Sequence, residues 1–204
     1  MSKNADSKPC NRLPKNVIFF ATGNIHKFNE ARSILSQYGI AVGMLKLKGD
    51  EIQSESLTDI AKKSVQNAYS SCRLPIFVED AGLFIDALKG FPGPYAAYVF
   101  HTIHNRGILK LMEKKKNRKS TFQSVIAYLG DPKQTEPLCF CGESKGKITT
   151  AEHVEQGKSG FGFDPIFQPD ETKKTFAEMT IEEKNGFSHR AMAVRKFAEW
   201  YAAR

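Results

Sequence analysis

An apolar run that ends in a short polar turn constrains the fold of this 204-residue chain more than any other feature. Residues 16–21 read NVIFFA, which is typical of a buried strand. The polar turn at residues 22–24 interrupts the run, and apolar residues at helical spacing follow over residues 28–35. A strand, a tight turn and a helix in this order predict an α/β fold.

The rest of the chain repeats this alternation and then changes character. Strands are expected at residues 41–47, 76–78, 121–129, 138–142 and 166–167, and helices at residues 57–69, 103–112 and 189–201. Glycines and prolines at residues 90–94 exclude regular structure there. Because helices separate the early strands but not the late ones, the pattern is compatible with a mixed sheet.

The length fits a single domain, since single cores extend to roughly 250–300 residues. We assign this domain to residues 16–204 and expect residues 1–15, which are polar and basic, to form a disordered tail rather than a signal peptide. No apolar run approaches the roughly 20 residues that span a bilayer, so we expect no membrane partner. The four cysteines contain no Cys-x-x-Cys pair, which indicates reduced thiols and a cytoplasmic location.

The net charge of +8 and the pI near 9.3 predict an anionic partner, which charge alone leaves open between nucleic acid, a membrane surface and a phosphate-rich small molecule. The densest basic run, residues 114–119, lacks an aromatic residue for base stacking. We therefore interpret that run as a solvated loop, and the nucleic-acid-binding module stays the less favoured alternative.

The adjacent acids Glu79 and Asp80 follow the apolar residues 76–78, as if a buried strand ended in two carboxylates. Two half-buried carboxylates side by side are costly to keep ionised without a cation. Mg²⁺ takes oxygen ligands and is usually held by one or two carboxylates together with water and substrate phosphate. The alternative is a solvated acidic turn.

Three further segments are candidate ligand sites. The turn at residues 22–24 precedes a helix, whose N-terminus suits phosphate, with Lys27 adding a charge in the first turn. Residues 161–165 place two aromatic rings and an acid in a glycine-containing loop, and Ser188 fits the N-cap of a helix that begins with His189 and Arg190. Taken singly, each segment is better explained without a ligand, as a plain β-to-α turn, a loop anchored in the core and a solvated helix cap.

Together, the segments resemble one family from about Val17 onward: the inosine triphosphate pyrophosphatases, also called the HAM1 family. The resemblance rests on Ala21-Thr22-Gly23-Asn24 with Lys27, Glu51-Ile52-Gln53, Val78-Glu79-Asp80, Gly90 to Tyr95, Phe161 to Pro165, Thr175 to Met179, and Glu183-Lys184-Asn185 with Ser188-His189-Arg190. It implies a long curved mixed β-sheet with flanking helices, two lobes around a central cleft, and a homodimer.

The resemblance also implies a reaction, the Mg²⁺-dependent hydrolysis of ITP, dITP and XTP to the monophosphate and pyrophosphate, with Mn²⁺ as a substitute ion. The implied metal ligands are Glu51, Glu79 and Asp80, and Asp80 is the implied catalytic base. The implied substrate-binding residues are Thr22, Gly23, Asn24, Ile25, His26, Lys27, Lys63, Ala81, Phe161, Gly162, Phe163, Asp164, Lys184, Ser188, His189 and Arg190. Of these, His189 and Arg190 would donate to the 6-oxo group and Phe163 would stack on the base.

Two departures from the family pattern keep a second function open. Ala81 stands where many members carry a serine, so a phosphate contact there would have to come from its amide. Ala97 stands where members often carry a basic residue. Both departures are compatible with a catalytically weakened nucleotide-binding protein, which pyrophosphate release would distinguish from an enzyme.

Overall fold

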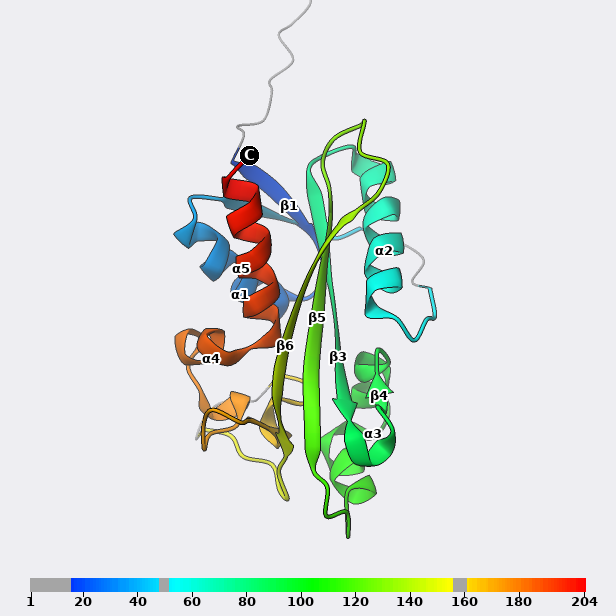
Figure 1. Cartoon of the computed structure of the whole chain (residues 1–204), viewed down its shortest axis with the longest axis vertical. Coiled ribbons are helices and arrows are strands. Elements are labelled where there is room, and N and C mark those ends of the chain that lie inside the picture. Colours follow the sequence, from blue (N-terminus) through cyan, green and yellow to red (C-terminus); the bar gives the residue numbers. More distant parts are fainter. Residues whose placement is uncertain (1–15, 48–51, 156–160) are drawn as a thin grey trace, which may run out of the picture.

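The computed structural model describes residues 16–47, 52–155 and 161–204. The tail predicted at residues 1–15 and the predicted metal ligand Glu51 lie outside the described residues. The described chain forms a mixed α/β fold in which one seven-stranded sheet is flanked by helices (Figure 1). The fold class expected from the sequence is therefore confirmed.

The elements follow one another along the chain with the following bounds. They are β1 (Val17–Ala21), α1 (Ile25–Gln37), β2 (Ala41–Leu45), α2 (Leu57–Cys72), β3 (Ile76–Ile85), β4 (Pro92–Gly93), α3 (Ala96–Leu111), β5 (Lys119–Leu129), β6 (Leu138–Ile148), β7 (Phe167–Pro169), α4 (Ile181–Phe187) and α5 (His189–Ala202). Short 3-10 turns cover Asp86–Leu88, Asp164–Ile166 and Phe176–Glu178.

The sheet combines a parallel and an antiparallel part. Its strand order is β2-β1-β3-β5-β6-β7, and β4 pairs with β3 beside this path. β1 runs parallel to β2 and β3, whereas β3, β5, β6 and β7 pair antiparallel. The helices α1 and α2 make the crossovers that parallel strands require. The antiparallel strands β5, β6 and β7 follow one another with no α-helix between them in the described residues. The early strand-helix alternation thus produces the parallel part.

β3 differs from the sequence-based expectation in a way that matters for the site. The strand does not end at the two acids; it continues to Ile85, because β5 pairs with it over its full length from Ile76 to Ile85. Successive side chains of a strand point to opposite faces of the sheet. Glu79 and Asp80 therefore point to opposite faces, and the repulsion expected between adjacent carboxylates is avoided.

Three other expectations need correction. β6 extends six residues beyond Gly142, because pairing with β5 holds a segment too polar to read as a strand. α3 begins at Ala96 rather than at Ile103, and its backbone is non-helical at His104. The loop at residues 90–94 contains the two-residue strand β4, because the chain there runs against β3.

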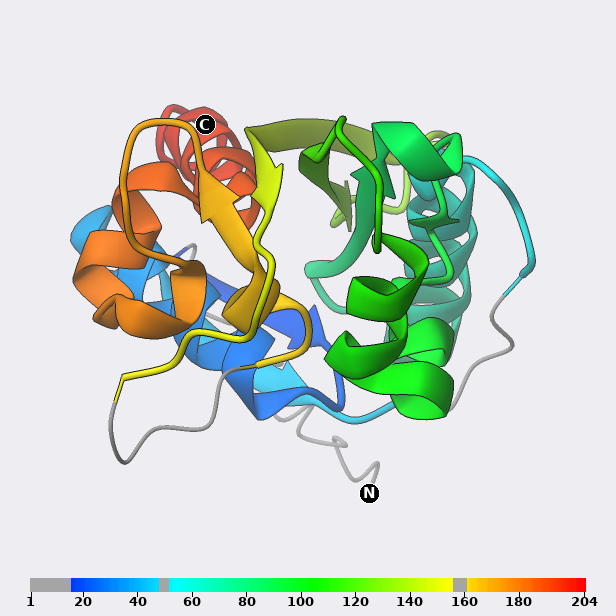
Figure 2. The same cartoon turned by 90° about the horizontal axis from the view of Figure 1, so that it is seen from below.

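Both faces of the sheet carry a hydrophobic core. On one face, α1 and α5 pack on Ile18, Phe20 and Phe77, and on the other α2 packs on Ile76 and Val78. A third cluster fills the far half, between α3 and the segment around β7. Figure 1 shows α1 and α5 on one side of the long central strands and α2 on the other, and Figure 2 shows α3 and α4 on opposite sides of the lower half.

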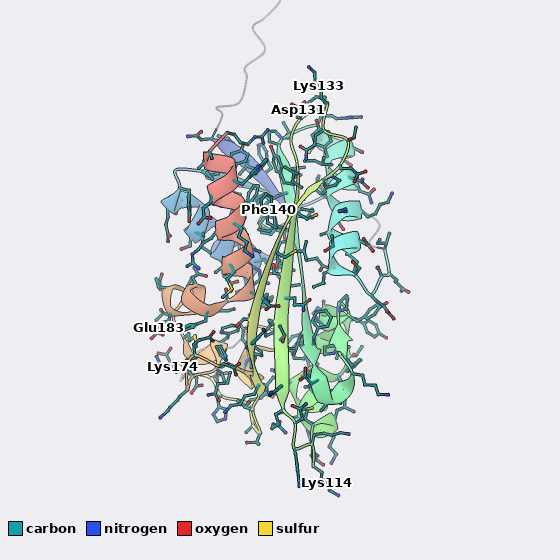
Figure 3. All side chains as sticks on the ribbon, in the orientation of Figure 1. Lys114, Asp131, Lys133, Phe140, Lys174 and Glu183 are labelled. Carbon is teal, nitrogen blue, oxygen red and sulfur yellow. The ribbon has the colours of Figure 1, made fainter. Side chains whose placement is uncertain are left out.

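The basic run lies far from the centre of the sheet. Lys114 occupies the tip of the connection between α3 and β5, at the opposite end of the molecule from Asp131 and Lys133 (Figure 3). Residues 114–117 are exposed, as expected for a solvated loop, but the expectation is wrong for the end of the run: Arg118 is partly buried and donates to the carbonyl oxygens of Ile148 (2.6 Å) and Met112 (3.1 Å), and Lys119 begins β5. Among the helices of the described segments, none has the length and apolar character needed to cross a membrane.

Candidate active site

A cavity of about 890 Å³ opens beside the middle of β3. Segments far apart in the sequence line it, from the start of α1 to the start of α5. The predicted site residues that line it are Asn24, Lys27, Asp80, Ala81, Phe161, Gly162, Phe163, Asp164, His189 and Arg190. The cavity thus collects most of the predicted substrate-binding segments.

Other predicted residues adjoin the residues that line the cavity or lie away from the cavity. Thr22, Gly23, Ile25 and His26 adjoin the lining residues in the first turn, and Lys184 and Ser188 are buried behind the wall. Lys63 is exposed on α2 and is not among the residues that line the cavity. The structure therefore does not bring Lys63 to the site.

The turn before α1 forms one end of the cavity. The Asn24 side chain caps the helix, since its Oδ1 accepts hydrogen bonds from the backbone N–H groups of His26 (3.0 Å) and Lys27 (3.2 Å). The Thr22 hydroxyl oxygen accepts from the Asn24 N–H at 3.1 Å. The first turn of α1 contains no acidic residue. The positive end of the helix dipole is thus left uncompensated beside Lys27, which favours an anionic ligand.

Asp80 and Ala81 form the floor next to this turn. Asp80 is partly buried, and its register partner on β5 is Val125. Its carboxylate is the acidic group that β3 presents to the cavity, whereas Glu79 is absent from the lining. Asp80 thus lines the same cavity as Asn24 and Lys27 of the α1 turn.

Glu79 is enclosed by cations instead. Its Oε2 lies 2.9 Å from Lys27 Nζ, its Oε1 lies 3.1 Å from Arg190 Nε, and the Ser124 hydroxyl donates to Oε1 at 2.6 Å. Burial alone would raise the pKa of Glu79, but Arg190 and Lys27 outweigh it and hold the pKa well below its usual range. A metal ion on this carboxylate would have to displace one of the two cations.

The other end of the cavity rests on further buried charges. Glu30 of α1 contacts Lys184 Nζ through Oε1 at 2.8 Å and contacts the Arg190 guanidinium through Oε2. Lys184 also contacts Asp164 Oδ2 at 2.6 Å. We call the series Asp164, Lys184, Glu30, Arg190, Glu79 and Lys27 the ion-pair chain. Its charges alternate in sign and sum to zero.

Burial and partners act against each other along the ion-pair chain. Burial would raise the pKa of Glu30, but Arg190 and Lys184 lower it to about 2. Burial would lower the pKa of Lys184, but Asp164 and Glu30 raise it. For Asp164 burial dominates, so its pKa is raised despite Lys184. Glu30, Lys184 and Arg190 therefore hold one another charged away from water, and removing one of these three leaves its partners uncompensated.

His189 is held flat against a phenylalanine. Its ring stacks on Phe122 with centroids 4.6 Å apart and planes 7° apart, and the residue is 2% exposed. Burial, reinforced by the charge of Arg190, places the pKa of His189 well below its usual value, so the ring is neutral near pH 7. Within the part of the chain that the structure describes, Nδ1 has no hydrogen-bond partner. A buried polar atom of this kind, in a residue that lines the cavity, is available to a ligand.

The first turn of α5 lies directly on β6. The Ser188 hydroxyl caps the helix by accepting from the Ala191 N–H at 3.1 Å, as the sequence predicted. A Cβ added at Gly142 would lie 2.2 Å from the His189 carbonyl oxygen, so only glycine permits this approach. Helix cap and sheet together fix where His189 and Arg190 meet the cavity.

The aromatic rings of the loop at residues 161–165 pack against other side chains and are not free to stack on a ligand from both sides. Phe163 is 4% exposed and meets Phe100 of α3 edge-on at 5.5 Å, although part of it lines the cavity. Phe161 is partly buried and stacks on His26 at 5.1 Å. The stacking role predicted for Phe163 stays a prediction.

Sequence reasoning missed two parts of the site. The first is the apolar wall, formed by Phe91, Tyr95, Tyr98, Val99, Phe100 and Ile103. Its helical pattern was expected only from Ile103 onward. The second comprises two buried residues that contact the charged groups of the site: Glu30, which accepts from Lys184, and Ser124, which donates to Glu79. Glu30 had a signal, since it stands four residues before Ile34 on the apolar face of α1.

The sheet with helices on both faces, and a cavity with a helix N-terminus at one end and buried cations at the other, define an α/β protein suited to an anionic ligand. The chain belongs to the Ham1 family, whose model matches residues 18–200.

Individual relatives agree with this assignment. A Methanopyrus kandleri protein named dITP/XTP pyrophosphatase is 50% identical over 184 residues, which are 90% of this chain and 95% of the relative. A Thermococcus kodakarensis protein of the same name is 47% identical over 89% of this chain and 95% of its own length. The solved structure of a HAM1 protein from Coxiella burnetii matches with a TM-score of 0.80 at 24% identity, covering 92% of this chain and 99% of that one, which shows the same fold.

Proposed function

We propose that this protein hydrolyses the non-standard purine nucleoside triphosphates ITP, dITP and XTP to the monophosphate and pyrophosphate, and so removes them from the nucleotide pool. The observation that carries the proposal is a single cavity with a phosphate-type end at Asn24 and Lys27 and a donor-rich end at His189 and Arg190. Relatives of 47% and 50% identity named dITP/XTP pyrophosphatase support it.

At the phosphate end, the first turn of α1 and Lys27 would bind the triphosphate. Amide N–H groups and an ammonium neutralise phosphate oxygens before a nucleophile approaches. Asp80, on the floor beside them, would take the proton of the attacking water. The chain's own residues thus supply anion binding and a base within one wall of the cavity.

The donor set at this end fits Mg²⁺, with Mn²⁺ as a substitute. Mg²⁺ needs only one or two carboxylates when the substrate provides phosphate oxygens, and Asp80 offers one. We assign the second ligand to Glu51, as the family resemblance implies, although Glu51 lies outside the described residues. When bound, the ion would neutralise phosphate charge in the transition state. Glu79 as a third ligand stays a prediction, since both its oxygens contact cations.

At the other end, His189 and Arg190 would recognise the purine. The 6-oxo group of hypoxanthine or xanthine accepts hydrogen bonds, whereas the 6-amino group of adenine donates them. Arg190 has five N–H donors, of which the ion-pair chain uses only part. An adenine base would leave buried donors unpaired, a cost of roughly 1–3 kcal/mol per group. Selection of oxopurines follows from that cost.

The test is an assay of pyrophosphate and monophosphate release from ITP, dITP, XTP, GTP and ATP, without added metal and with Mg²⁺ or Mn²⁺. We expect metal-dependent release from the first three, with kcat/KM for ATP at least tenfold lower. Equal kcat/KM for ITP and ATP would overturn the base assignment. Nucleotide binding without pyrophosphate release would instead support the catalytically weakened alternative.

We expect Arg190→Ala to reduce the difference in kcat/KM between ITP and ATP, mainly by slowing the hydrolysis of ITP. The expected loss is ten- to a hundredfold in kcat/KM for ITP, because donors to the 6-oxo group disappear. Arg190→Lys, which keeps the charge but not the planar donor set, is the matched variant. Loss of activity on ITP and ATP by the same factor would count against a role in base recognition.

The remaining expectations are a homodimer in the cytoplasm that binds neither membrane nor nucleic acid. Phe91, Tyr95 and Tyr98, around the start of α3, are 40%, 43% and 71% exposed, which supports contact with a second copy. Light scattering on the purified protein would give the mass directly. A monomer at micromolar concentration would contradict the dimer proposal.

A further inference from the structure

A serine on β5 contacts the carboxylate that lies between the two ends of the cavity. Ser124 is fully buried, and its hydroxyl donates to Glu79 Oε1 at 2.6 Å. The same Oε1 lies 3.1 Å from Arg190 Nε, whereas Oε2 lies 2.9 Å from Lys27 Nζ. The two oxygens of one carboxylate thus contact the base-end and the phosphate-end cation separately, and Ser124 holds the oxygen at the base end.

The strand register explains why this contact is well defined. Ser124 lies directly opposite Ala81 in the antiparallel pair of β3 and β5, so its side chain shares a face with Glu79, two residues away. The Glu79 side chain is 1% exposed, and a hydrogen bond to a buried charged group contributes more than one in water. The hydroxyl therefore restricts the orientation of the carboxylate.

The two cations depend on that orientation to different degrees. Lys27 has a second anchor, because its Nζ also donates to the backbone carbonyl of Glu79 at 3.3 Å. Arg190 is also anchored by Glu30, but its contact with Glu79 is to Oε1, the oxygen that Ser124 holds, whereas Lys27 contacts Oε2. Movement of Oε1 would thus disturb Arg190 more than Lys27.

We propose that Ser124 is a positioning residue for purine selection, which fixes Glu79 so that Arg190 presents its remaining N–H groups to the cavity. The inference rests on the proposed function and extends it, because a residue outside the cavity lining would then set base selectivity. Glu79 would also connect purine recognition to the phosphate-binding turn through Lys27. The substrate pair that reports on this role is ITP against ATP.

The experiment compares Ser124→Ala with Ser120→Ala. Ser120 is a matched control, since it lies on the same face of β5, is 2% exposed and has a hydroxyl without a hydrogen-bond partner in the described ranges. We expect Ser124→Ala to lower kcat/KM for ITP about tenfold and that for ATP less than about twofold, and Ser120→Ala to change neither. Equal losses on both nucleotides, or no loss, would overturn the proposal.

A double-mutant cycle separates positioning from general structural support. Combined with Arg190→Lys, Ser124→Ala should have less than about a twofold further effect on ITP, because the guanidinium that it positions is gone. Additive losses would show that Ser124 does not act through Arg190. Ser124→Thr retains the hydroxyl and should recover selectivity if the added methyl group is accommodated.

Failure of the proposed function and failure of this inference give different results. Absence of pyrophosphate release from every purine triphosphate in the wild-type protein would defeat the proposed function. The same cycle measured as midpoints of denaturant unfolding then decides the inference. Non-additive midpoint shifts for Ser124→Ala and Arg190→Lys would support the coupling through Glu79, and additive shifts would overturn it.

Discussion

The two ends of the cavity handle charge in opposite ways. At the phosphate end, the turn before α1 is local in sequence and partly exposed, and its positive charge comes from the uncompensated N-terminus of α1 and from Lys27. At the base end, Arg190 and Lys184 are 3% and 6% exposed, and their partners come from three other segments of the chain. The phosphate end is therefore partly exposed and formed by one local segment, whereas the cations of the base end are buried and held in place by ion pairs.

Under the proposed function, the difference follows from what each end has to distinguish. A triphosphate carries so much charge that exposed donors and a helix terminus suffice to attract it. An oxo group and an amino group differ only in the direction of one hydrogen bond, and that difference costs little in water. It becomes large where unpaired donors are shielded from solvent, which requires the cations to be balanced beforehand by Glu30, Glu79 and Asp164.

The largest expected effect tests the phosphate end. Asp80→Asn should lower kcat by at least the 10²–10⁴-fold typical of a lost general base, because the amide can neither accept the proton nor bind metal as a carboxylate. Steady-state kinetics on ITP would measure the loss. The unfolding midpoint and ITP binding should be nearly unchanged. A variant that retained most of the wild-type rate would remove Asp80 from the centre of the reaction.

The next effect tests the buried end through pH. Because the folded-state pKa of Glu30 is lowered to about 2 from 4.5, its ionised form stabilises the fold above pH 4.5 and this contribution is lost as the pH falls towards 2. The difference corresponds to about 3 kcal/mol. Glu30→Gln should therefore be less stable than wild type at pH 7 by up to about this amount, with the gap closing in acid.

Urea unfolding of both proteins between pH 2 and 7 would measure the gap. Glu113→Gln is the matched control, since it removes an exposed ion pair with Lys110 on the surface and should have little effect. A gap between Glu30→Gln and wild type that stays constant with pH would show that the Glu30 carboxylate is not held ionised by Arg190 and Lys184. The contrast between the two ends would then lose its electrostatic basis.

The smallest effect concerns the cap of α1. Asn24→Ala removes the acceptor of two backbone N–H groups and should cost about 1 kcal/mol of stability. It should also raise KM for ITP and ATP alike, because the cap orients the phosphate end and not the base end. Asn24→Ser preserves the capping oxygen and is the control. A change in the ratio of ITP to ATP turnover would contradict the prediction that the two ends act independently.

Much of the fold was predictable because its signals are local. The runs at β1 and α1, the α2 pattern and the Ser188 cap are each confirmed within a few residues. β3 and β6 were predicted too short, because cross-strand pairing extends them through acids, glycines and lysines that have weak strand preference. The start of α3 was predicted too late. Its first turns line the cavity, and tertiary packing there, which the sequence pattern did not reveal, extends the helix back to Ala96.

The site divides along the same line. The sequence by itself determined the turn before α1 and the Ser188 cap that begins α5 at His189, because caps and turns depend on neighbours within a few residues. Only the tertiary structure decided that Glu79 faces away from Asp80 and contacts Arg190 and Lys27. Contacts between residues as far apart as Glu30 and Arg190 depend on strand register and helix docking, and buried charges can be kept only where those long-range contacts balance them.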